Sequence, residues 1–522
     1  MKLASSAEAQ ELDRQASDSW GLPSHALVEA AGRLCAQKLI ASFPALFAER
    51  IPRIAVLAGS GNNGADALVC LRALLCSRSA DLSRSSVFLS RESPGSDRSP
   101  RGEAERSLTA MGVRVRVWTC SDCECPDDLA QADLIIDGIS GTGLRGALSG
   151  TPLSMVQALD ARSAEEIKHA HRPLVVSIDL PSGLSEAWRP GMALVRADAT
   201  LAVEPIKKVL YLPMARMYAG AIFPVLGLYP PSLVDTLPGP DLCDFDGLSR
   251  TLPSISPDSY KHLRGVVEIW AGASSSSGAA RLAGRGAQAA GAGLVRLVVD
   301  PAIRGTLAVS AGGVMVAVPE DVRREPDRFS PDAVLLGPGW GRGPDRAAVL
   351  DGFLGKAGPA LILDADAILL AKGRKFSGNV VMTPHPGEMA AFLGIDKNEL
   401  LADPDPILLA AAKKLRIVIV FKGHTIRIVS EDGRMTVVDG MAPILAMGGS
   451  GDVLAGLAAA LIARCPTRLH DAAACAAALL IAAGRAAAAH SGFCDPLDVA
   501  AEAGRIAGAA WLPPLAAVPK EK

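Results

Sequence analysis

Short apolar runs alternate with longer stretches of helical pattern through the first half of the chain. The apolar runs occupy Ile54–Leu57, Val87–Leu89, Val113–Val117, Leu134–Ile136, Val175–Ile178 and Thr200–Val203. Several of them are apolar at every position, as expected of strands that are covered on both faces. The alternation therefore predicts a parallel sheet between layers of helices, an α/β fold.

The same rhythm returns in the second half of the chain. Here the apolar runs occupy Val266–Trp270, Leu294–Val299, Val314–Val318, Ala333–Leu336, Ala360–Leu363 and Ile417–Val420. The stretch HTIRIVSEDGRMTVVDG predicts a β-hairpin that turns at Asp432 and Gly433. From Asp452 onward the sequence is rich in alanine, which predicts helices that can pack closely.

A change of composition separates the two series. The chain has 522 residues, which is too long for one ordinary core. Residues 229–258 are rich in proline and aspartate and have no sustained periodicity, as is typical of a linker. We therefore predict a first domain over residues 1–230, a linker over residues 231–256 and a second domain over residues 257–515.

Composition and charge narrow the class of protein. Hydrophobic residues make up 49% and the net charge is −2, so we expect no surface for nucleic acid or for an anionic membrane. The first fourteen residues are charged, which argues against a secretion signal, and the apolar stretch 472–484 is too short to cross a bilayer. Ten scattered cysteines suit a reducing cytoplasm, and Cys120, Cys123 and Cys125 are interpreted as reduced thiols rather than metal ligands.

The first candidate site begins at a glycine-rich turn. In AVLAGSGNNGADALVCLRALL, residues 55–75, an apolar strand enters the turn and a helix leaves it. The N–H groups at the start of a helix bind anions such as phosphate. The adjacent Asn62 and Asn63 add amide groups, whose oxygen can ligate a cation and whose nitrogen can donate to a ligand.

Two further predicted strands end at acidic residues. Asp137 precedes the glycine-rich loop GISGTGLRG, and Asp179 precedes LPSGL. Either aspartate alone is equally well interpreted as a helix cap. Ligands gather at the carboxyl ends of parallel strands, so the two carboxylates and the Asn-Asn turn together predict one shared site.

These segments resemble the NAD(P)H-hydrate epimerase family, whose motifs are similar to GxGNNGGDG, DAxxGTG and DxPSG. The resemblance implies a Rossmann-like three-layer αβα domain that interconverts the R and S epimers of a nicotinamide cofactor hydrated on its reduced ring. It implies that Asp179 is the acid–base carboxylate and that a potassium ion is held by Asn63, Asp137 and Ser182. Substrate contacts are then expected from Asn62, Asn63, Gly64, Ala65 and Asp66, which would bind phosphates and ribose, and from Gly141, Thr142, Gly143, Leu144, Arg145, Gly146, Ala147 and Asp179.

The chain departs from the first of these motifs at two positions, where Ala65 and Ala67 stand in place of glycine. If either position required a positive φ, strain of about 1–3 kcal/mol would follow. If both lie in the first turn of the helix, alanine is favourable instead. A nucleotide-binding module without catalysis is thus an alternative for this half, although Asn63, Asp137 and Asp179 are retained.

A second glycine-rich turn, AMGGSGDVLAG over residues 446–456, precedes the alanine-rich helices. Gly448, Gly449 and Gly451 would place N–H groups around a phosphoryl group, and Asp452 follows at the start of the helix. An aspartate in this place can be a helix cap only, but the complete turn before it favours a site.

This turn is similar to the glycine–aspartate signature of ribokinase-like folds. Before it, SYKHLRGVVEIWAGA, LLGPGWG, LILDADAI, VVMTPHPGEMAAFLG and VFKGHT occur in order. Together these motifs resemble the NAD(P)H-hydrate dehydratase domain, from Ser259 to about Ala510. The resemblance implies a ribokinase-like α/β domain that uses ADP, or ATP as the alternative, with magnesium. Dehydration of the S epimer would return NADH or NADPH with release of AMP and phosphate.

The resemblance also assigns residues to the second site. Asp452 would take the proton of the ring hydroxyl. The hydrated cofactor would contact Ala279 or Ala280, Gly339, His385 and Asp452, and the adenine nucleotide would contact Lys422, Gly423, His424, Thr425, Ile426 and Gly451. The family's lead-in NPGMATGGTGD differs here, because Ala442 and Met447 replace its asparagine and a threonine.

Two alternatives remain open from the sequence. A small-molecule kinase acting on a vitamin-type alcohol would share the phosphate turn and Asp452, with a non-catalytic nucleotide-binding domain before it, although the TPHPGE and DADA runs argue against it. The oligomeric state also stays open, since alanine-rich helices pack equally well inside one subunit or between copies in a homo-oligomer.

Overall fold

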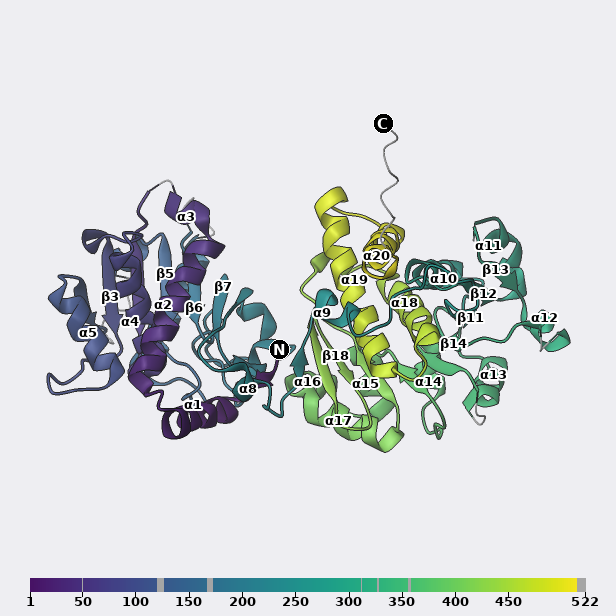
Figure 1. Cartoon of the computed structure of the whole chain (residues 1–522), viewed down its shortest axis with the longest axis horizontal. Coiled ribbons are helices and arrows are strands. Elements are labelled where there is room, and N and C mark those ends of the chain that lie inside the picture. Colours follow the sequence, from purple (N-terminus) through teal and green to yellow (C-terminus); the bar gives the residue numbers. More distant parts are fainter. Residues whose placement is uncertain are drawn as a thin grey trace. The chain divides into compact units, whose positions relative to one another are not determined.

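The computed structural model describes residues 1–48, 50–119, 126–166, 172–310, 312–325, 328–354 and 358–513. The three cysteines 120, 123 and 125 and the predicted end of the second domain at residue 515 lie outside these residues. The chain divides into two units, Met1–Pro240 and Asp241–Lys522 (Figure 1). The division lies within the segment predicted as a linker, residues 231–256.

Unit 1 is built on a seven-stranded parallel sheet with the order β4-β3-β2-β5-β6-β7-β9. Its strands are β2 (Ile54–Ala58), β3 (Ser85–Leu89), β4 (Arg114–Val117), β5 (Leu134–Gly138), β6 (Leu174–Ile178), β7 (Ala199–Val203) and β9 (Ala221–Val225). A separate parallel pair joins β1 (Leu3–Ala4) to β8 (Ile206–Lys207). The six predicted strands are confirmed, whereas β1, β8 and β9 were not predicted.

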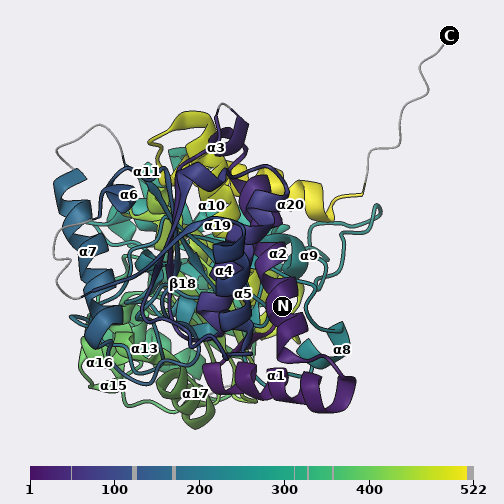
Figure 2. The same cartoon turned by 90° about the vertical axis from the view of Figure 1, so that its left-hand side faces the viewer.

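Helices cover both faces of this sheet. The helices of this unit in the described chain are α1 (Ser6–Trp20), α2 (Ser24–Ser42), α3 (Pro44–Ala48), α4 (Asn62–Cys76), α5 (Pro100–Ala110), α6 (Asp127–Ala130), α7 (Gly150–Glu166) and α8 (Pro231–Val234). Along β2, Val56 packs in the core under α2 and α4, while Ala55 and Leu57 pack on the other face with Met155 of α7. Figure 2 shows α7 on the opposite side of unit 1 from α2 and α4. The predicted three-layer arrangement is confirmed.

Unit 2 contains a ten-stranded sheet with the order β10-β19-β18-β17-β16-β15-β14-β11-β12-β13. The strands are β10 (Asp241–Leu242), β11 (Val266–Trp270), β12 (Leu294–Val298), β13 (Met315–Ala317), β14 (Ala333–Leu336), β15 (Ala360–Leu363), β16 (Val380–Met382), β17 (Val418–Phe421), β18 (Thr425–Val429) and β19 (Met435–Asp439). The pairing is parallel except on both sides of β18, and the antiparallel β18–β19 pair is the predicted hairpin. The six strands predicted for this half are also present.

The helices of unit 2 form two layers on this sheet. One core lies under α9 (Phe245–Ser249), α10 (Ser277–Ala289), α18 (Ser450–Arg464), α19 (Leu469–Ser491) and α20 (Pro496–Trp511). The other core lies under α13 (Pro344–Leu354), α14 (Asp366–Leu370), α15 (Pro386–Leu393), α16 (Lys397–Ala402) and α17 (Pro404–Leu415). The remaining helices of this unit in the described chain are α11 (Arg304–Ser310) and α12 (Pro319–Arg324).

Small residues let the helices around the second glycine turn approach closely. A Cβ on Gly456 of α18 would lie 2.0 Å from the Ala283 carbonyl oxygen of α10, and one on Gly286 would lie 2.4 Å from the Val453 carbonyl oxygen. This contact fixes the start of α18 against α10.

The alanine-rich helix α19 is longer than the apolar stretch 472–484, which was judged too short to cross a bilayer. By length and composition alone it could cross a membrane, but 72% of its apolar window is buried inside the structure. Its neighbours α18, α20 and α9 cover it, so it is a core helix of unit 2.

Candidate active sites

A cavity of about 460 Å³ lies in unit 1 at the carboxyl ends of the parallel strands. Its wall is formed by α1, α2, the first turn of α4, the loop after β5, the end of β6 and the segment around β8. The residues predicted as substrate contacts that line it are Asn62, Asn63, Gly64, Asp66, Gly141, Thr142, Gly143, Leu144 and Asp179. Three separate loops of the sequence therefore meet at one place.

Close backbone contacts shape the Asn-Asn turn. A Cβ on Gly59 would lie 1.9 Å from the Ile139 carbonyl oxygen, and one on Gly64 would lie 2.3 Å from the Gly59 carbonyl oxygen. Only glycine fits at these two positions. The helix α4 begins directly after the turn, at Asn62, so its free N–H groups face the cavity.

The three residues predicted as potassium ligands lie together. The Asp137 carboxylate accepts hydrogen bonds from the Ser177 hydroxyl (2.7 Å) and from the Ser182 backbone N–H (2.9 Å). The Asn63 amide nitrogen donates to the Ser140 carbonyl oxygen (2.8 Å), and the Ser182 hydroxyl lies 3.3 Å from the same oxygen. Burial raises the pKa of Asp137, although its hydrogen bonds act in the opposite direction.

One ligand atom at this place is left without a partner. The Oδ1 atom of Asn63 is buried and accepts no hydrogen bond from any described residue. A buried amide oxygen beside a buried carboxylate suits a hard monovalent or divalent cation. The residues present therefore fit the predicted potassium ion.

Asp179 is held in an unusual backbone conformation directly after β6. Its φ is +63°, a region that non-glycine residues rarely occupy and that concentrates at functional sites. Its carboxylate pairs with the Lys207 ammonium of β8, with 2.7 Å between Oδ1 and Nζ, and Lys207 also donates to the Val203 carbonyl oxygen (3.0 Å). Burial raises the pKa of Asp179, while the Lys207 charge opposes that shift.

Sequence reasoning missed Lys207 and two other polar residues of the cavity. The Tyr229 hydroxyl donates to the Asp13 carboxylate of α1, and both residues line the cavity. A lysine inside the apolar stretch AVEPIKKVLYL was the available signal for Lys207. Asp13 and Tyr229 lie 216 positions apart, so no local pattern connects them.

Some predicted contacts do not face the cavity. Arg145, Gly146 and Ala147 are not among the residues that line it. Ala65 and Ala67 lie in the first two turns of α4, neither has a positive φ, and both are buried in the core of unit 1. Alanine is therefore favourable at both positions, and Ala65 could reach a substrate only through its backbone.

The change from glycine to alanine at position 67 is accompanied by an opposite change on strand β5. The related motif DAxxGTG has alanine after its aspartate, whereas this chain has Gly138 after Asp137. A Cβ on Gly138 would lie 2.6 Å from the Ala67 Cβ, which is closer than real Cβ contacts. The extra methyl group at position 67 thus occupies the space left by the missing one at position 138.

The second site surrounds the start of α18 in unit 2. Gly449 caps this helix with a φ of +98°, and Asp452 lies in its first turn. Burial raises the pKa of Asp452 to about 6, with a further contribution from Asp364 and an opposing one from Lys422. A carboxylate with this pKa is largely ionised at neutral pH and can accept a proton.

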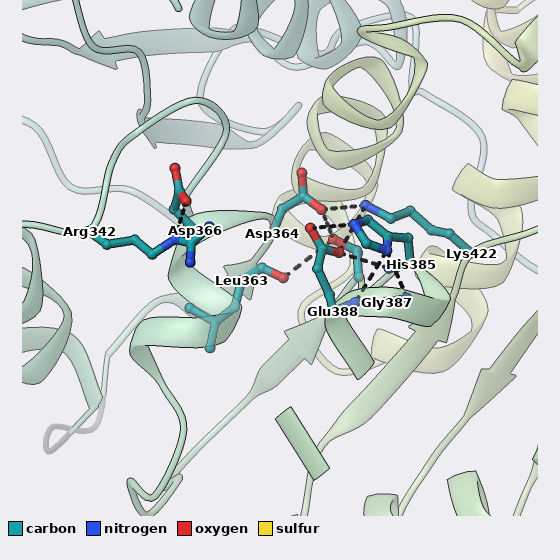
Figure 3. A network of polar contacts seen from close by, with 9 residues as sticks. Arg342, Leu363, Asp364, Asp366, His385, Gly387, Glu388 and Lys422 are labelled. Atoms are coloured by element: carbon teal, nitrogen blue, oxygen red, sulfur yellow. Dashed lines mark hydrogen bonds and ion pairs between the residues drawn. The ribbon is translucent and has the colours of Figure 1, made fainter. Parts of the chain in front are cut away.

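Lys422 connects the carboxylates of this site (Figure 3). Its ammonium lies 2.7 Å from the Asp364 Oδ1 atom and 4.0 Å from the Glu388 Oε2 atom. Burial disfavours the charged ammonium, but the charges of Asp364, Glu388 and Asp452 outweigh burial and raise the pKa of Lys422. Thr383 also donates to Asp364 (2.7 Å), and the residue after Asp364, Ala365, has a φ of +45°.

His385 has a structural role beside this network. It caps α15, because its Nδ1 atom accepts from the Gly387 N–H (3.0 Å) and the Glu388 N–H (3.2 Å). The backbone N–H of His385 donates to the Glu388 carboxylate (2.8 Å), and the His385 side chain is 56% exposed. His385 can therefore cap the helix and still meet a ligand at the carboxyl end of β16.

The remaining predicted contacts of unit 2 differ in how exposed their side chains are. A Cβ on Gly339 would lie 2.9 Å from the Ala279 Cβ, so these two residues adjoin, whereas Ala280 is fully buried in the core. Thr425 and Ile426 are buried in β18, so only their backbone is available to a nucleotide. Gly423 and His424 are exposed beside Lys422. Asp364, Thr383 and Glu388 were not predicted, although they lie in or next to the DADA and TPHPGE runs.

Comparisons with known proteins agree with two sites on one chain. Residues 24–209 match the family described as YjeF-related protein N-terminus, and residues 267–504 match the family described as NAD(P)H-hydrate dehydratase. A bifunctional NAD(P)H-hydrate repair enzyme from Moorella thermoacetica is 31% identical over 88% of each chain. Another from Gloeobacter violaceus is 31% identical over 89% of each chain.

A solved structure is also similar to the second unit. It is an ADP/ATP-dependent NAD(P)H-hydrate dehydratase from Bacillus subtilis that was co-crystallised with ATP and Mg²⁺. It shows 25% identity and a TM-score of 0.47, over 52% of this chain and 98% of that one.

Proposed function

This chain belongs to the family of bifunctional NAD(P)H-hydrate repair enzymes, and we propose that its two units catalyse successive steps of one repair. Unit 1 interconverts the R and S epimers of hydrated NADH or NADPH. Unit 2 dehydrates the S epimer with ADP and returns NADH or NADPH, AMP and phosphate. The observation that carries this proposal is that two separate carboxylate sites, each behind a glycine turn, lie on one chain that spans most of the length of its relatives.

In unit 2 the reaction begins at the hydroxyl of the hydrated ring. Asp452 accepts the hydroxyl proton as the oxygen attacks the terminal phosphoryl group of ADP, and AMP leaves. Loss of phosphate from the ring and of a proton from the adjacent carbon then restores the double bond. The N–H groups of the turn and the Lys422 ammonium would stabilise the charge of the transferred group.

Magnesium would enter unit 2 with the nucleotide. Mg²⁺ binds mainly to phosphate oxygens, with one or two carboxylates completing its ligands. Asp364 and Glu388 are the carboxylates that adjoin Lys422, so they are the side chains that we expect to face the ion. The resemblance favours ADP over ATP as the co-substrate, and a direct comparison of the two nucleotides tests that preference.

In unit 1 the hydrated cofactor would occupy the cavity, with its phosphates at the start of α4 and its ring near Asp179. Potassium, held by Asn63, Asp137 and Ser182, would compensate the buried carboxylate and fix the loop after β5 against α4. The buried Asn63 Oδ1 atom, which has no hydrogen-bond partner among the described residues, supports this assignment. Omitting potassium is expected to lower epimerisation and leave dehydration unchanged.

One assay tests the whole proposal. The chain is incubated with a mixture of R and S NADH hydrate, ADP, magnesium and potassium, and the absorbance of reduced nicotinamide is followed. Complete recovery, faster than spontaneous epimerisation allows, is the expected result. Recovery of the S fraction alone would contradict the epimerase assignment. No recovery with either nucleotide, together with a phosphorylated product, would support a small-molecule kinase instead.

A further inference from the structure

Asp66 of α4 is a second buried carboxyl group in the cavity of unit 1. It is 91% buried, lines the cavity, and its Oδ1 atom accepts no hydrogen bond from any described residue. A polar atom buried in this way normally costs stability, so its presence facing a cavity requires an explanation. The resemblance accounts for Asp66 only as a contact for ribose or phosphate.

Lys207, the one lysine among the described residues that line the cavity, makes no ion pair with Asp66. The Lys207 ammonium is bound to Asp179 at 2.7 Å and to the Val203 carbonyl oxygen at 3.0 Å. Asp179 therefore has a cationic partner, whereas the described residues provide no ion pair for Asp66. Two carboxyl groups on one cavity thus have different environments, which is how a site assigns opposite proton-transfer roles to two chemically identical groups.

Burial and the surrounding charges favour a protonated Asp66. The titratable groups that act on it are Asp13 from α1, Cys35 from α2, Cys70 from α4 itself, Asp179 after β6 and Lys207 from β8. Burial, followed by the charge of Asp179, raises the pKa of Asp66 well above its ordinary value, and Lys207 only partly opposes the shift. Burial also raises the pKa of both thiols, so they add no charge near neutral pH.

We propose that Asp66 is the general acid of the epimerase, opposite Asp179 as the general base; the assignment rests on the proposed function of unit 1. The hydroxyl on the hydrated ring carbon leaves as water with the Asp66 proton, while the ring nitrogen supplies the electron pair that closes a C=N bond. Water adds to the same carbon from the other face, and Asp179 takes its extra proton. One proton then returns from Asp179 to Asp66, so no net proton is gained or lost. The other epimer reacts by the same steps in reverse order, which begin with transfer of the proton from Asp66 to Asp179.

The test measures epimerisation of purified R NADH hydrate without ADP, so that dehydration does not remove the product. For Asp66→Asn we expect kcat to fall about 10²- to 10⁴-fold with KM changed less than about threefold, because the amide keeps the shape but has no acidic proton. Asp66→Glu is expected to recover part of kcat. Asp18→Asn, on an exposed ion-paired residue of α1, is the matched control and is expected to keep the wild-type rate.

The pH profile separates catalysis from binding. Wild-type kcat is expected to fall on the alkaline side as Asp66 loses its proton, and Asp66→Asn is expected to lack that limb. In heavy-oxygen water, each epimerisation is expected to place labelled oxygen on the ring. An active Asp66→Asn, a rise in KM without a fall in kcat, an unchanged alkaline limb or retained oxygen would each overturn the proposal. A wild-type chain that dehydrates the S epimer but never epimerises would overturn the proposed function of unit 1 as well.

The wild-type pH profile also decides the case in which Asp66→Asn does not fold. An alkaline limb in the wild type, together with activity in Asp66→Glu, would then support the assignment, and absence of the limb would overturn it. We expect Asp66→Asn to melt no lower than the wild type at neutral pH, because an amide is neutral at every pH, whereas the Asp66 carboxyl group must take up a proton when it is buried.

Discussion

The two units place the same local structure in two different electrostatic settings. Each has a glycine turn, a helix that begins at the turn and an aspartate in the first turns of that helix, Asp66 in α4 and Asp452 in α18. Burial raises the pKa of both carboxyl groups. In each unit the charge of one lysine opposes this shift while its ammonium is bound to another aspartate, Lys422 to Asp364 and Lys207 to Asp179. Asp66 is buried and its pKa lies well above the ordinary value, whereas Asp452 is only partly buried and its pKa is about 6.

The position of an aspartate behind a glycine turn therefore does not define its role. The extent of burial, which is the largest cause of the raised pKa at both aspartates, decides whether the carboxyl group keeps or releases its proton at neutral pH. Asp452 is therefore suited to take a proton from a hydroxyl group, and Asp66 to give one. Four measurements test the assignments in the two units.

The largest effect is expected from Asp452→Asn. Removing the base should lower kcat of dehydration by about 10²- to 10⁴-fold, because no other group would take the hydroxyl proton. Epimerisation should be unchanged, since unit 1 holds its own carboxylates. Recovery of reduced nicotinamide from S NADH hydrate measures the first effect. Asp246→Asn, on an exposed residue of α9, is the matched control, and a dehydratase loss no larger than in that control would contradict the role of Asp452.

The second largest effect is expected from Lys207→Met. Removing one partner of a buried ion pair typically costs about 3–5 kcal/mol in the free energy of unfolding, because the other charge is left uncompensated. The variant should regain stability as the pH is lowered, since the unpaired Asp179 then has a raised pKa in the folded state and is stable in its protonated form. Urea unfolding at two pH values measures this.

Two further variants control this experiment. Asp179→Asn combined with Lys207→Met is expected to be more stable than Lys207→Met alone, because no charge is left buried. Lys208→Met changes the next, less buried lysine and should cost much less. Equal losses in Lys207→Met and Lys208→Met would show that the Lys207–Asp179 pair does not stabilise unit 1.

A smaller effect is expected from Gly138→Ala, which tests the packing of α4 on β5. The new methyl group would lie 2.6 Å from the Ala67 Cβ, and overpacking of this kind costs about 1–3 kcal/mol. A Cβ on Gly138 would also lie 2.8 Å from the Asn63 carbonyl oxygen, and glycine at position 67 weakens the helix. Ala67→Gly together with Gly138→Ala should therefore lose less stability than the sum of the two single variants in a urea unfolding experiment. Gly143→Ala, whose Cβ meets no atom within 4 Å, is the control for stability. Additive losses in the double variant would contradict the proposed exchange.

The smallest effect is a pH dependence of the wild-type dehydratase. Asp452 must be ionised to act as a base, so kcat/KM should be constant above its pKa of about 6 and fall about tenfold for each pH unit below it. Initial rates with S NADH hydrate between acid and neutral pH measure the profile. A constant kcat/KM through this range would contradict the assignment of Asp452 as the base.

Much of the fold and part of the sites followed from local pattern. All twelve predicted strands are present because continuous apolar runs bounded by turn residues are distinctive in a buried parallel sheet. The strands that were missed are short, such as β1 and β8, or carry a proline at a sheet edge, as Pro224 does in β9. The site loops were found because strand ends and glycine turns are visible in the sequence.

The sequence by itself determined the two α/β units, the two glycine turns and the aspartates that follow them, since each depends on residues close together in the chain. Only the tertiary structure decided which polar groups meet: Lys207 with Asp179, the Tyr229 hydroxyl with Asp13, and Lys422 with Asp364. It also decided that Ala67 lies against Gly138. These pairings join separate elements, and the pKa of a carboxyl group depends on burial and on neighbouring charges, which exist only once the chain is packed.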